Sequence, residues 1–431
     1  MALDTGPAHG TEALARLAEE HVDHRFKGLP PDAYGLTVAE LAGQRRNLFT
    51  DGFTTPVLAL SAERLEHNLK LMETYSARHG LAFAPHGKTS MAPQLFQRQI
   101  EHGAWGITLA VPHQVRVARA FGVQRVFLAN ELVDAAALRW ISSELDADPD
   151  FRFVCYADSV RGVALMDAAL TEASASRPVD VVVELAAGEG ARTGVRTEAE
   201  CAAVADAVAG ARTLRLAGVA GYEGEVPDAD PEKVHAWLRR LVALAVDFDK
   251  AGRFEGLEEI VLSAGGSAWF DAVADVFAEV PALSVPVLKL LRSGAYVSHD
   301  DGHYRELTPF NRVPGEGALE PAFRLWSQVV SRPSPAQAFT NAGKRDAAYD
   351  LHLPFAQVVR RDGVERPATG IEVTGLSDQH AWLRTTAQAD LEVGDWLGTG
   401  LSHPCTSFDK WQLIPVAEAD GTVVDYIRTF F

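Results

Sequence analysis

Short apolar runs alternate with amphipathic stretches along most of the chain. Amphipathic stretches such as 200–210 and 234–252 end in glycine, as helices commonly do. Runs that are apolar almost throughout are typical of strands buried on both faces of a parallel sheet. Eight runs have this character, and they cover residues 81–86, 104–110, 125–130, 151–156, 179–185, 214–222, 258–264 and 286–292. The pattern therefore predicts eight strands that alternate with helices.

Eight βα units predict an α/β fold in which the strands close into a TIM (β/α)8 barrel. An open, doubly wound sheet is the alternative architecture. The barrel is favoured because polar and glycine-rich segments follow the strands directly. Barrel enzymes build their sites from the loops at the carboxyl ends of the strands.

The two ends of the chain have different patterns. Residues 11–49 are polar with helical spacing, interrupted at Pro30 and Pro31, and a short β run at 57–60 precedes a helix capped at Ser61. Beyond about residue 300, alternating stretches separated by Gly, Pro and Asp predict a β-rich domain. We expect three parts, which are an N-terminal helical segment that packs on the β-rich domain (1–54), the barrel (55–305) and the C-terminal β-rich domain (306–431).

Composition narrows the class of protein and its surroundings. The chain has 431 residues, of which 47% are apolar and 23% charged, with a formal net charge of -18. This charge argues against a nucleic-acid or membrane partner. Three cysteines, Cys155, Cys201 and Cys405, make no disulfide framework, and no secretory signal or membrane-spanning run is visible. We therefore expect a cytoplasmic protein.

Lys88 is the first candidate for chemistry. It lies in the segment APHGKTSMAP (84–93), at the end of the first predicted barrel strand, where its side chain would point into the cavity. An amine that forms a Schiff base must be partly desolvated so that it can be neutral and nucleophilic. An ordinary surface lysine in a loop is the other interpretation, and this motif alone does not decide between them.

Two glycine-rich loops follow the last two predicted barrel strands. Gly265, Gly266 and Ser267 lie in SAGGSAW, before a helix, and Tyr296 ends the loop RSGAY (292–296). Glycine N–H groups and helix N-termini bind anions, and barrels commonly bind phosphate in these two loops. Two tight turns would give a similar sequence, but their joint position favours a phosphate site.

Arg192 and Tyr222 follow the fifth and sixth predicted strands. Each could face an acidic oxygen or a ring atom of a cofactor. Each could equally be a capping or packing residue, because a single residue after a strand carries little information.

The C-terminal domain contains His403 and Cys405, two positions apart in LSHPCTSFDKW. Imidazole and thiolate suit zinc, and two protein ligands completed by water or substrate are typical of a catalytic zinc. From the spacing alone, a buried cysteine beside a turn histidine is the preferred interpretation. The segment HDDGHY (299–304) also has metal-binding residue types. Its central Asp-Gly argues against a helix that would align His299 with His303, so we expect at most a loop that lines the site.

Taken in order, these motifs resemble the alanine-racemase-like (fold-type III) pyridoxal-phosphate enzymes, and most closely the D-serine dehydratase and D-threonine aldolase family. The family's Pro-His-x-Lys-Thr, Arg-x-Gly-Val, Gly-Tyr-Glu-Gly and Gly-Gly-Ser motifs match residues 85–89, 192–195, 221–224 and 265–267. Its metal pair is His-x-Cys in dehydratases and His-x-Asp in aldolases, and this chain has His403-Pro404-Cys405. The resemblance covers the chain from about Thr55 to the C-terminus.

The chain also departs from the family pattern. Ser90 and Met91 stand where the family often has His-Lys, and residues 184–188 replace an Asp-x-Gly strand end. These differences resemble a divergent bacterial branch, the cryptic D-serine dehydratases. They leave the substrate more open than the cofactor.

The resemblance implies a site and a reaction. Lys88 would hold pyridoxal 5'-phosphate as a Schiff base and act as the general base on the substrate's Cα. Zn2+ on His403 and Cys405 would bind the β-hydroxyl of D-serine, or of another small β-hydroxy D-amino acid, and help it leave. The products would be a 2-oxo acid and ammonia. The implied cofactor-binding residues are His86, Lys88, Arg192 at the phenolic oxygen, Tyr222 near the pyridine nitrogen, and Gly265, Gly266, Ser267 and Tyr296 at the phosphate. A homodimer is implied as well.

Three other functions stay open at this point. D-threonine aldolase-type cleavage of the Cα–Cβ bond would use the same cofactor and metal. An amino-acid racemase needs no metal and would leave His403 and Cys405 unexplained. A non-catalytic pyridoxal-phosphate carrier is typically a bare barrel, so the β-rich domain and the metal pair argue against it.

Overall fold

The computed structural model describes residues 7–431, with side chains from residue 12 onward, and divides into two compact units. The first unit is made mainly of residues 72–88 and 99–294. The second contains residues 12–71, 89–98 and 295–431. The expected boundaries after residues 54 and 305 differ from this division, because the chain passes between the units several times.

Eight parallel strands form the sheet of the first unit, in the order β2-β9-β8-β7-β6-β5-β4-β3. A parallel bridge between His86 and Thr108 joins β2 to β3, so that the sheet closes on itself. The predicted TIM-type barrel is confirmed. Its strands are β2 (Ala82–Phe83), β3 (Ile107–Leu109), β4 (Arg125–Glu131), β5 (Arg152–Ala157), β6 (Val179–Leu185), β7 (Leu214–Gly221), β8 (Ile260–Ala264) and β9 (Val287–Leu291).

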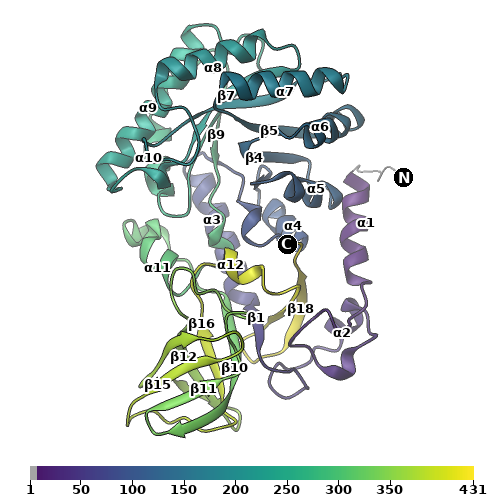
Figure 1. The fold of residues 1–431 in the computed structure, drawn as a ribbon, viewed down its shortest axis with the longest axis vertical. Helices are drawn as coiled ribbons and strands as arrows, with labels where there is room; N and C mark the ends of the chain where they lie inside the picture. The colour runs from purple at the N-terminus through teal and green to yellow at the C-terminus, as the bar shows by residue number, and fades with distance from the viewer. Residues whose placement is uncertain (1–6) are drawn as a thin grey trace. The chain divides into compact units, whose positions relative to one another are not determined.

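Helices follow the strands and lie around the sheet (Figure 1). Asp134, Ser159 and Thr197 cap three of them by accepting the N–H of the residue three positions on. These caps satisfy the first N–H groups of each helix, so the chain can turn into a helix soon after it leaves a strand. The helices are α5 (Pro112–Ala120), α6 (Ala135–Ala147), α7 (Val160–Glu172), α8 (Glu198–Gly210), α9 (Pro231–Lys250) and α10 (Phe270–Ala278); α3 (Ala62–Arg78) and α4 (Pro93–Glu101) have residues in both units.

Apolar side chains fill the inside of the barrel. All seven residues of β6 are buried, as expected for a strand covered on both faces. The groups that could react are therefore found at the ends of the strands. One cluster of packed residues contains Ala84, Phe127, Val154, Tyr156, Val182, Ala217, Ala220, Val261 and Leu290.

Gly218 lets strands β7 and β8 approach each other closely. A Cβ atom at this position would collide with the backbone of Val261 on β8. The pairing of β6 with β7 also changes register here, between Val181 and Val182, as at a β-bulge. Because β7 continues into Gly221, this packing sets the position of the residues that follow the strand.

The second unit is built on a ten-stranded sheet, with the order β13-β12-β16-β10-β1-β17-β18 and with β11, β15 and β14 joined to β10. The β run at 57–60 is β1 (Val57–Ser61), which pairs with β10 and β17 of this sheet. The predicted β-rich C-terminal domain is confirmed. Its strands are β10 (Phe323–Ser334), β11 (Gln337–Thr340), β12 (Phe355–Arg361), β13 (Val364–Pro367), β14 (Ile371–Leu376), β15 (Ala381–Thr385), β16 (Trp396–Gly400), β17 (Leu413–Ala417) and β18 (Val423–Arg428).

The N-terminal segment is less helical than its pattern predicts. Between residues 7 and 54, only α1 (Pro7–Ala18), α2 (Val38–Gly43) and a short 3-10 turn form. Gly28 and Gly35 have positive φ values of +83° and +92°, which interrupt a helix. Apolar side chains of this segment pack against the sheet of the second unit and form one hydrophobic core with it. This core includes Val22, Phe26, Leu29, Leu41, Leu48, Val57, Trp326 and Leu413. Over residues 7–431, no helix has the length and apolar character that crossing a membrane requires.

Replacing Gly218 with alanine should destabilise the barrel, because the added methyl group would collide with β8. We expect the free energy of unfolding, measured with urea, to fall by about 2 kcal/mol or more. Gly210→Ala is the matched control, since nothing lies within 4 Å of a Cβ atom at this end of α8. Its stability should be unchanged or slightly higher. Equal stability of the two variants would contradict the close approach of β7 and β8.

Candidate active site

Lys88 lies just beyond the carboxyl end of β2, in the 3-10 turn Gly87–Thr89, and its side chain is exposed. His86 pairs with β3 through its backbone, and its Nδ1 atom is buried without a hydrogen-bond partner. Burial, and then the charges of Lys88 and Arg292, hold the pKa of His86 well below its usual range. The imidazole is therefore neutral near pH 7, beside two cationic side chains.

Arg292 follows β9 and crosses the mouth of the barrel. Its guanidinium, in a residue that is only 5% exposed, donates to the hydroxyl of Tyr156 on β5 and, at 2.5 Å, to the carbonyl oxygen of Gly221 on β7. Arg292 is not among the site residues predicted from the sequence. The available signal was a lone arginine at the end of an apolar strand, directly before a glycine loop.

Tyr222 packs against the backbone of two glycines. A Cβ atom at Gly224 or at Gly266 would collide with its ring. Burial raises the pKa of Tyr222 to about 12, so the phenol stays protonated near neutral pH. Arg192 lies with its guanidinium carbon 5.8 Å from the centre of the Tyr222 ring and forms an ion pair with Glu225. The two predicted residues therefore lie close together.

Glu223 is a fully buried residue that the sequence analysis missed. Its carboxylate accepts the N–H of Gly265 at 2.8 Å and the N–H of Gly266 at 2.5 Å. These are two of the groups expected to bind phosphate. A phosphate in this loop would have to displace Glu223 or use other donors, such as Ser267.

The structure brings most of the predicted cofactor-binding residues to one end of the barrel. His86, Lys88, Arg192, Tyr222, Gly265, Gly266 and Ser267 all follow the carboxyl ends of strands. Tyr296 is buried in the 3-10 turn Ala295–Val297, which is part of the second unit.

In the second unit, His403 lies between two side chains with which it can form hydrogen bonds. Its Nδ1 is 2.5 Å from a carboxylate oxygen of Asp350, and Cys405 is its other hydrogen-bond partner. Cys405, and then Asp350, raise the pKa of His403 to about 9. The thiol of Cys405 also lies 3.4 Å from the hydroxyl of Thr89, the residue that follows Lys88. The side chains of residues 12–431 form no cluster of three or more metal-binding groups.

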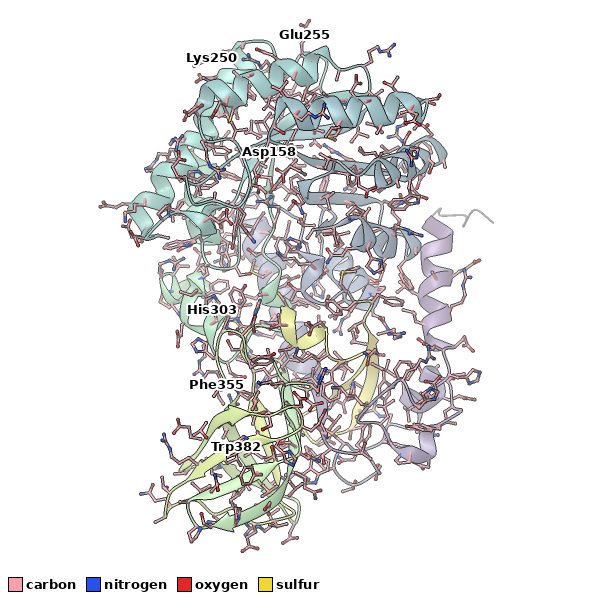
Figure 2. The ribbon with its side chains drawn as sticks, viewed as in Figure 1. Asp158, Lys250, Glu255, His303, Phe355 and Trp382 are labelled. Carbon is pink, nitrogen blue, oxygen red and sulfur yellow. The ribbon has the colours of Figure 1, made fainter. Side chains whose placement is uncertain are left out.

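The HDDGHY loop supports the segment that carries His403. Asp300 is buried and accepts four backbone N–H groups, including those of Tyr304 at 2.9 Å and His403 at 2.8 Å. The helix α11 (His303–Leu307) begins at His303 (Figure 2), so His299 does not share it. The prediction that no helix aligns the two histidines is confirmed.

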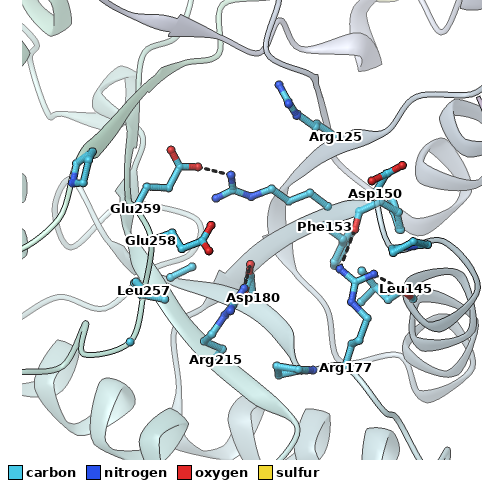
Figure 3. A pocket seen from close by; sticks show the side chains of 17 residues that line it. Arg125, Leu145, Asp150, Phe153, Arg177, Asp180, Arg215, Leu257, Glu258 and Glu259 are labelled. Carbon is cyan, nitrogen blue, oxygen red and sulfur yellow. Dashed lines mark hydrogen bonds and ion pairs between the residues drawn. The ribbon is translucent and has the colours of Figure 1, made fainter.

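A cavity of about 810 Å³ lies at the opposite, amino-terminal ends of the barrel strands (Figure 3). Its charged side chains are largely paired with each other. Arg215 binds both oxygens of Asp180, Arg152 pairs with Glu259, and Arg177 donates to three backbone carbonyls. The lining includes no lysine, histidine, cysteine or serine. We therefore assign the carboxyl ends of the strands, and not this cavity, as the candidate active site.

Comparisons with known proteins identify the family of the chain. A family model described as alanine racemase, N-terminal domain, matches residues 60–280, and one described as putative serine dehydratase domain matches residues 322–417. The chain is 27% identical over 377 residues to a D-threonine aldolase from Arthrobacter sp, an alignment that covers 86% of this chain and 90% of the relative.

The solved structures that are similar to this one include an aldolase and a dehydratase. The D-threonine aldolase from Filomicrobium marinum has a TM-score of 0.72 at 25% identity, with 88% of this chain and 95% of that one covered. A metal-free variant of a D-threo-3-hydroxyaspartate dehydratase, in which a cysteine is replaced by alanine, has a TM-score of 0.69 at 22% identity, with 89% and 99% covered. At 22% identity, the similarity to the dehydratase shows a shared fold only.

Replacing Glu223 with alanine should loosen the glycine loop, because one buried and one partly buried N–H group lose their carboxylate acceptor. We expect the free energy of unfolding to fall by about 3 kcal/mol. Glu225→Gln is the control in the same loop: it removes the partner of an exposed arginine and should cost about 0.5 kcal/mol. A similar loss in both variants would argue against a special role for Glu223.

Proposed function

The chain belongs to the alanine racemase family and has the fold of the fold-type III pyridoxal-phosphate enzymes, and from this premise we propose that it dehydrates and deaminates a small β-hydroxy D-amino acid such as D-serine. Water would be lost first, and hydrolysis of the resulting imine would release a 2-oxo acid and ammonia.

The observation that carries this proposal is the pair formed by His403 and Cys405. The two side chains are hydrogen-bonded, and Cys405 contacts Thr89, next to Lys88 in the chain. A dehydratase of the same fold has been solved as a cysteine-to-alanine variant in its metal-free form. The resemblance assigns His-x-Cys to dehydratases and His-x-Asp to aldolases.

The residues at the mouth of the barrel fit the aldehyde and the ring of pyridoxal phosphate, while its phosphate would have to displace Glu223 or use other donors, such as Ser267. When bound, this cofactor supplies an aldehyde that condenses with amines and a ring that withdraws electrons from the substrate's Cα. Lys88 would hold it, since its exposed amine lies at the strand end nearest His86. Lys88, once released by the substrate, would take the Cα proton. Neutral His86 avoids a further positive charge beside that amine.

The metal proposal rests on the chemistry of the donors. Imidazole and thiolate are ligands that zinc prefers, and water with substrate would complete the coordination. Asp350 binds Nδ1 of His403 and so leaves Nε2 for a metal, an arrangement common around metal-bound histidines. The part of the metal ion would be to stabilise the departing hydroxide, which is a poor leaving group without a positive partner.

Aldolase activity is the second candidate, and the 27% identity to a D-threonine aldolase favours it. Racemase activity needs no metal, so it would leave His403 and Cys405 without a role in the reaction. The second unit argues against a pyridoxal-phosphate carrier, since a bare barrel would suffice for that role.

Product analysis should separate these functions. With D-threonine we expect 2-oxobutanoate and ammonia, and with D-serine pyruvate and ammonia, measured by coupled assay and mass spectrometry. A chelator should abolish the reaction, and added zinc should restore it. Glycine and acetaldehyde from D-threonine would identify an aldolase instead, and L-allo-threonine formed without carbon loss would identify a racemase, which inverts only Cα.

Two alanine variants should test the binding of pyridoxal phosphate and the binding of zinc separately. Lys88→Ala should remove the visible absorbance of lysine-bound pyridoxal phosphate. Cys405→Ala should keep that absorbance, lose bound zinc as measured by elemental analysis, and lower turnover at least about 100-fold. Cys201→Ala, which removes a buried thiol from α8, is the control and should change neither readout. Retained turnover of Cys405→Ala in the presence of chelator would rule out the metal step.

A further inference from the structure

Two glutamates that are not among the predicted site residues meet at the carboxyl ends of β4 and β6. Glu131 is the last residue of β4, and Glu184, 5% exposed, is the next-to-last residue of β6. Their side chains are in hydrogen-bond contact with each other. Strand β5 lies between their strands and carries Tyr156, the hydroxyl partner of Arg292.

The contact needs a proton. Within the described residues, Oε1 of Glu131 and Oε2 of Glu184 are buried and have no hydrogen-bond partner. The backbone of Gly194 closes one side, since a Cβ atom there would lie 3.1 Å from Oε2 of Glu184. Two ionised carboxylates in such a place repel each other, and each unpaired oxygen is an acceptor that lacks a donor. One proton held between them removes both costs.

Charged and polar groups from the neighbouring strand ends surround the pair. Asp158, which follows β5 (Figure 2), adds a third carboxylate and accepts the N–H of Gly194 at 3.4 Å. Thr193 is a hydrogen-bond partner of Glu184, and Arg292 adds a positive charge near it.

These neighbours act differently on the two glutamates. Burial, and then the charge of Glu184, raise the pKa of Glu131 to about 9. Burial raises the pKa of Glu184 as well, but the bonds from Glu131 and Thr193 and the charge of Arg292 favour its ionised form. The proton therefore belongs on Glu131.

We propose that Glu131 is protonated near neutral pH and donates a hydrogen bond to ionised Glu184, so that the pair presents one negative charge to Arg292. Two acceptors of the guanidinium, the Tyr156 hydroxyl and the Gly221 carbonyl, are both neutral. Glu184 then supplies the counter-charge that holds Arg292 across the mouth of the barrel. Glu131 and Glu184 are positioning residues, which act on the proposed reaction through Arg292.

Infrared spectroscopy tests the proton directly and needs neither cofactor nor substrate. The difference spectrum between the unaltered protein and Glu131→Gln should contain the carbonyl band of a protonated carboxylic acid at pH 7. The band should disappear as the pH rises, with a midpoint near the pKa of about 9. Absence of the band at pH 7 would overturn the proposal, whatever reaction the protein catalyses.

A second experiment tests the negative charge that the glutamate pair presents to Arg292. It is done with the cofactor bound and therefore rests on the proposed function. The readout is the pH at which the visible absorbance of the bound cofactor titrates. Glu131→Gln replaces one neutral group with another, so this midpoint should stay in place. The double variant Glu131→Gln/Glu184→Gln removes the negative charge, and the midpoint should fall by roughly one unit, because a cationic Schiff base loses stabilisation.

The opposite assumption, two ionised glutamates, gives a different pattern. Glu131→Gln alone would then remove a negative charge and shift the midpoint by about half as much as the double variant, which would overturn the proposal. Glu258→Gln, at the amino-terminal end of the barrel, removes a carboxylate far along the strands and should leave the midpoint unchanged. A protein that binds no pyridoxal phosphate would refute the proposed function, while the infrared band would still decide the state of the pair.

Discussion

A buried guanidinium at the mouth of the barrel is the interaction on which the groups around it depend. Arg292 extends from the end of β9 to Tyr156 on β5 and to the carbonyl of Gly221 on β7. Burying such a charge is unfavourable unless its donors are paired and an opposite charge is near. Two neutral oxygens accept hydrogen bonds from the guanidinium, and Glu184 on β6 supplies the opposite charge. Strand ends from across a closed sheet are thereby tied together at one point, directly beside His86 and Lys88.

The barrel could be predicted from the sequence because its strands are almost purely apolar. The run predicted at 179–185 coincides with β6, whose seven residues are all buried. The position of Lys88 after a strand followed from the same pattern, since all strands of a parallel barrel end on the same side. Tyr222 was found for the same reason, and the glycines against which its ring packs explain why its motif is rich in glycine.

The remaining parts of the site could not be predicted, because they depend on contacts between strand ends that are far apart in the sequence. Glu223 accepts hydrogen bonds from the glycine loop that follows α9 and β8 in the chain. No local sequence pattern predicts a bond between residues so far apart in the sequence. Glu131 meets Glu184 because β4 and β6 lie on either side of β5 and end at the same side of the sheet. The helical prediction for the N-terminal segment was wrong for a local reason. The spacing of its polar residues is helical, but hydrophobic periodicity does not show that its glycines have positive φ values.

The two ends of the barrel show how differently a set of charges can be used. At the amino-terminal end, Arg152 and Arg215 each have their own carboxylate, so the cavity there keeps little charge for a ligand. At the carboxyl end, a proton shared by Glu131 and Glu184 leaves the mouth one charge more positive than two ionised carboxylates would. Pyridoxal phosphate and the carboxylate of an amino acid are both anions, and a desolvated site attracts them more strongly with that extra charge. The same protonation therefore lowers the repulsion between two buried acids and favours the ligands that the family binds.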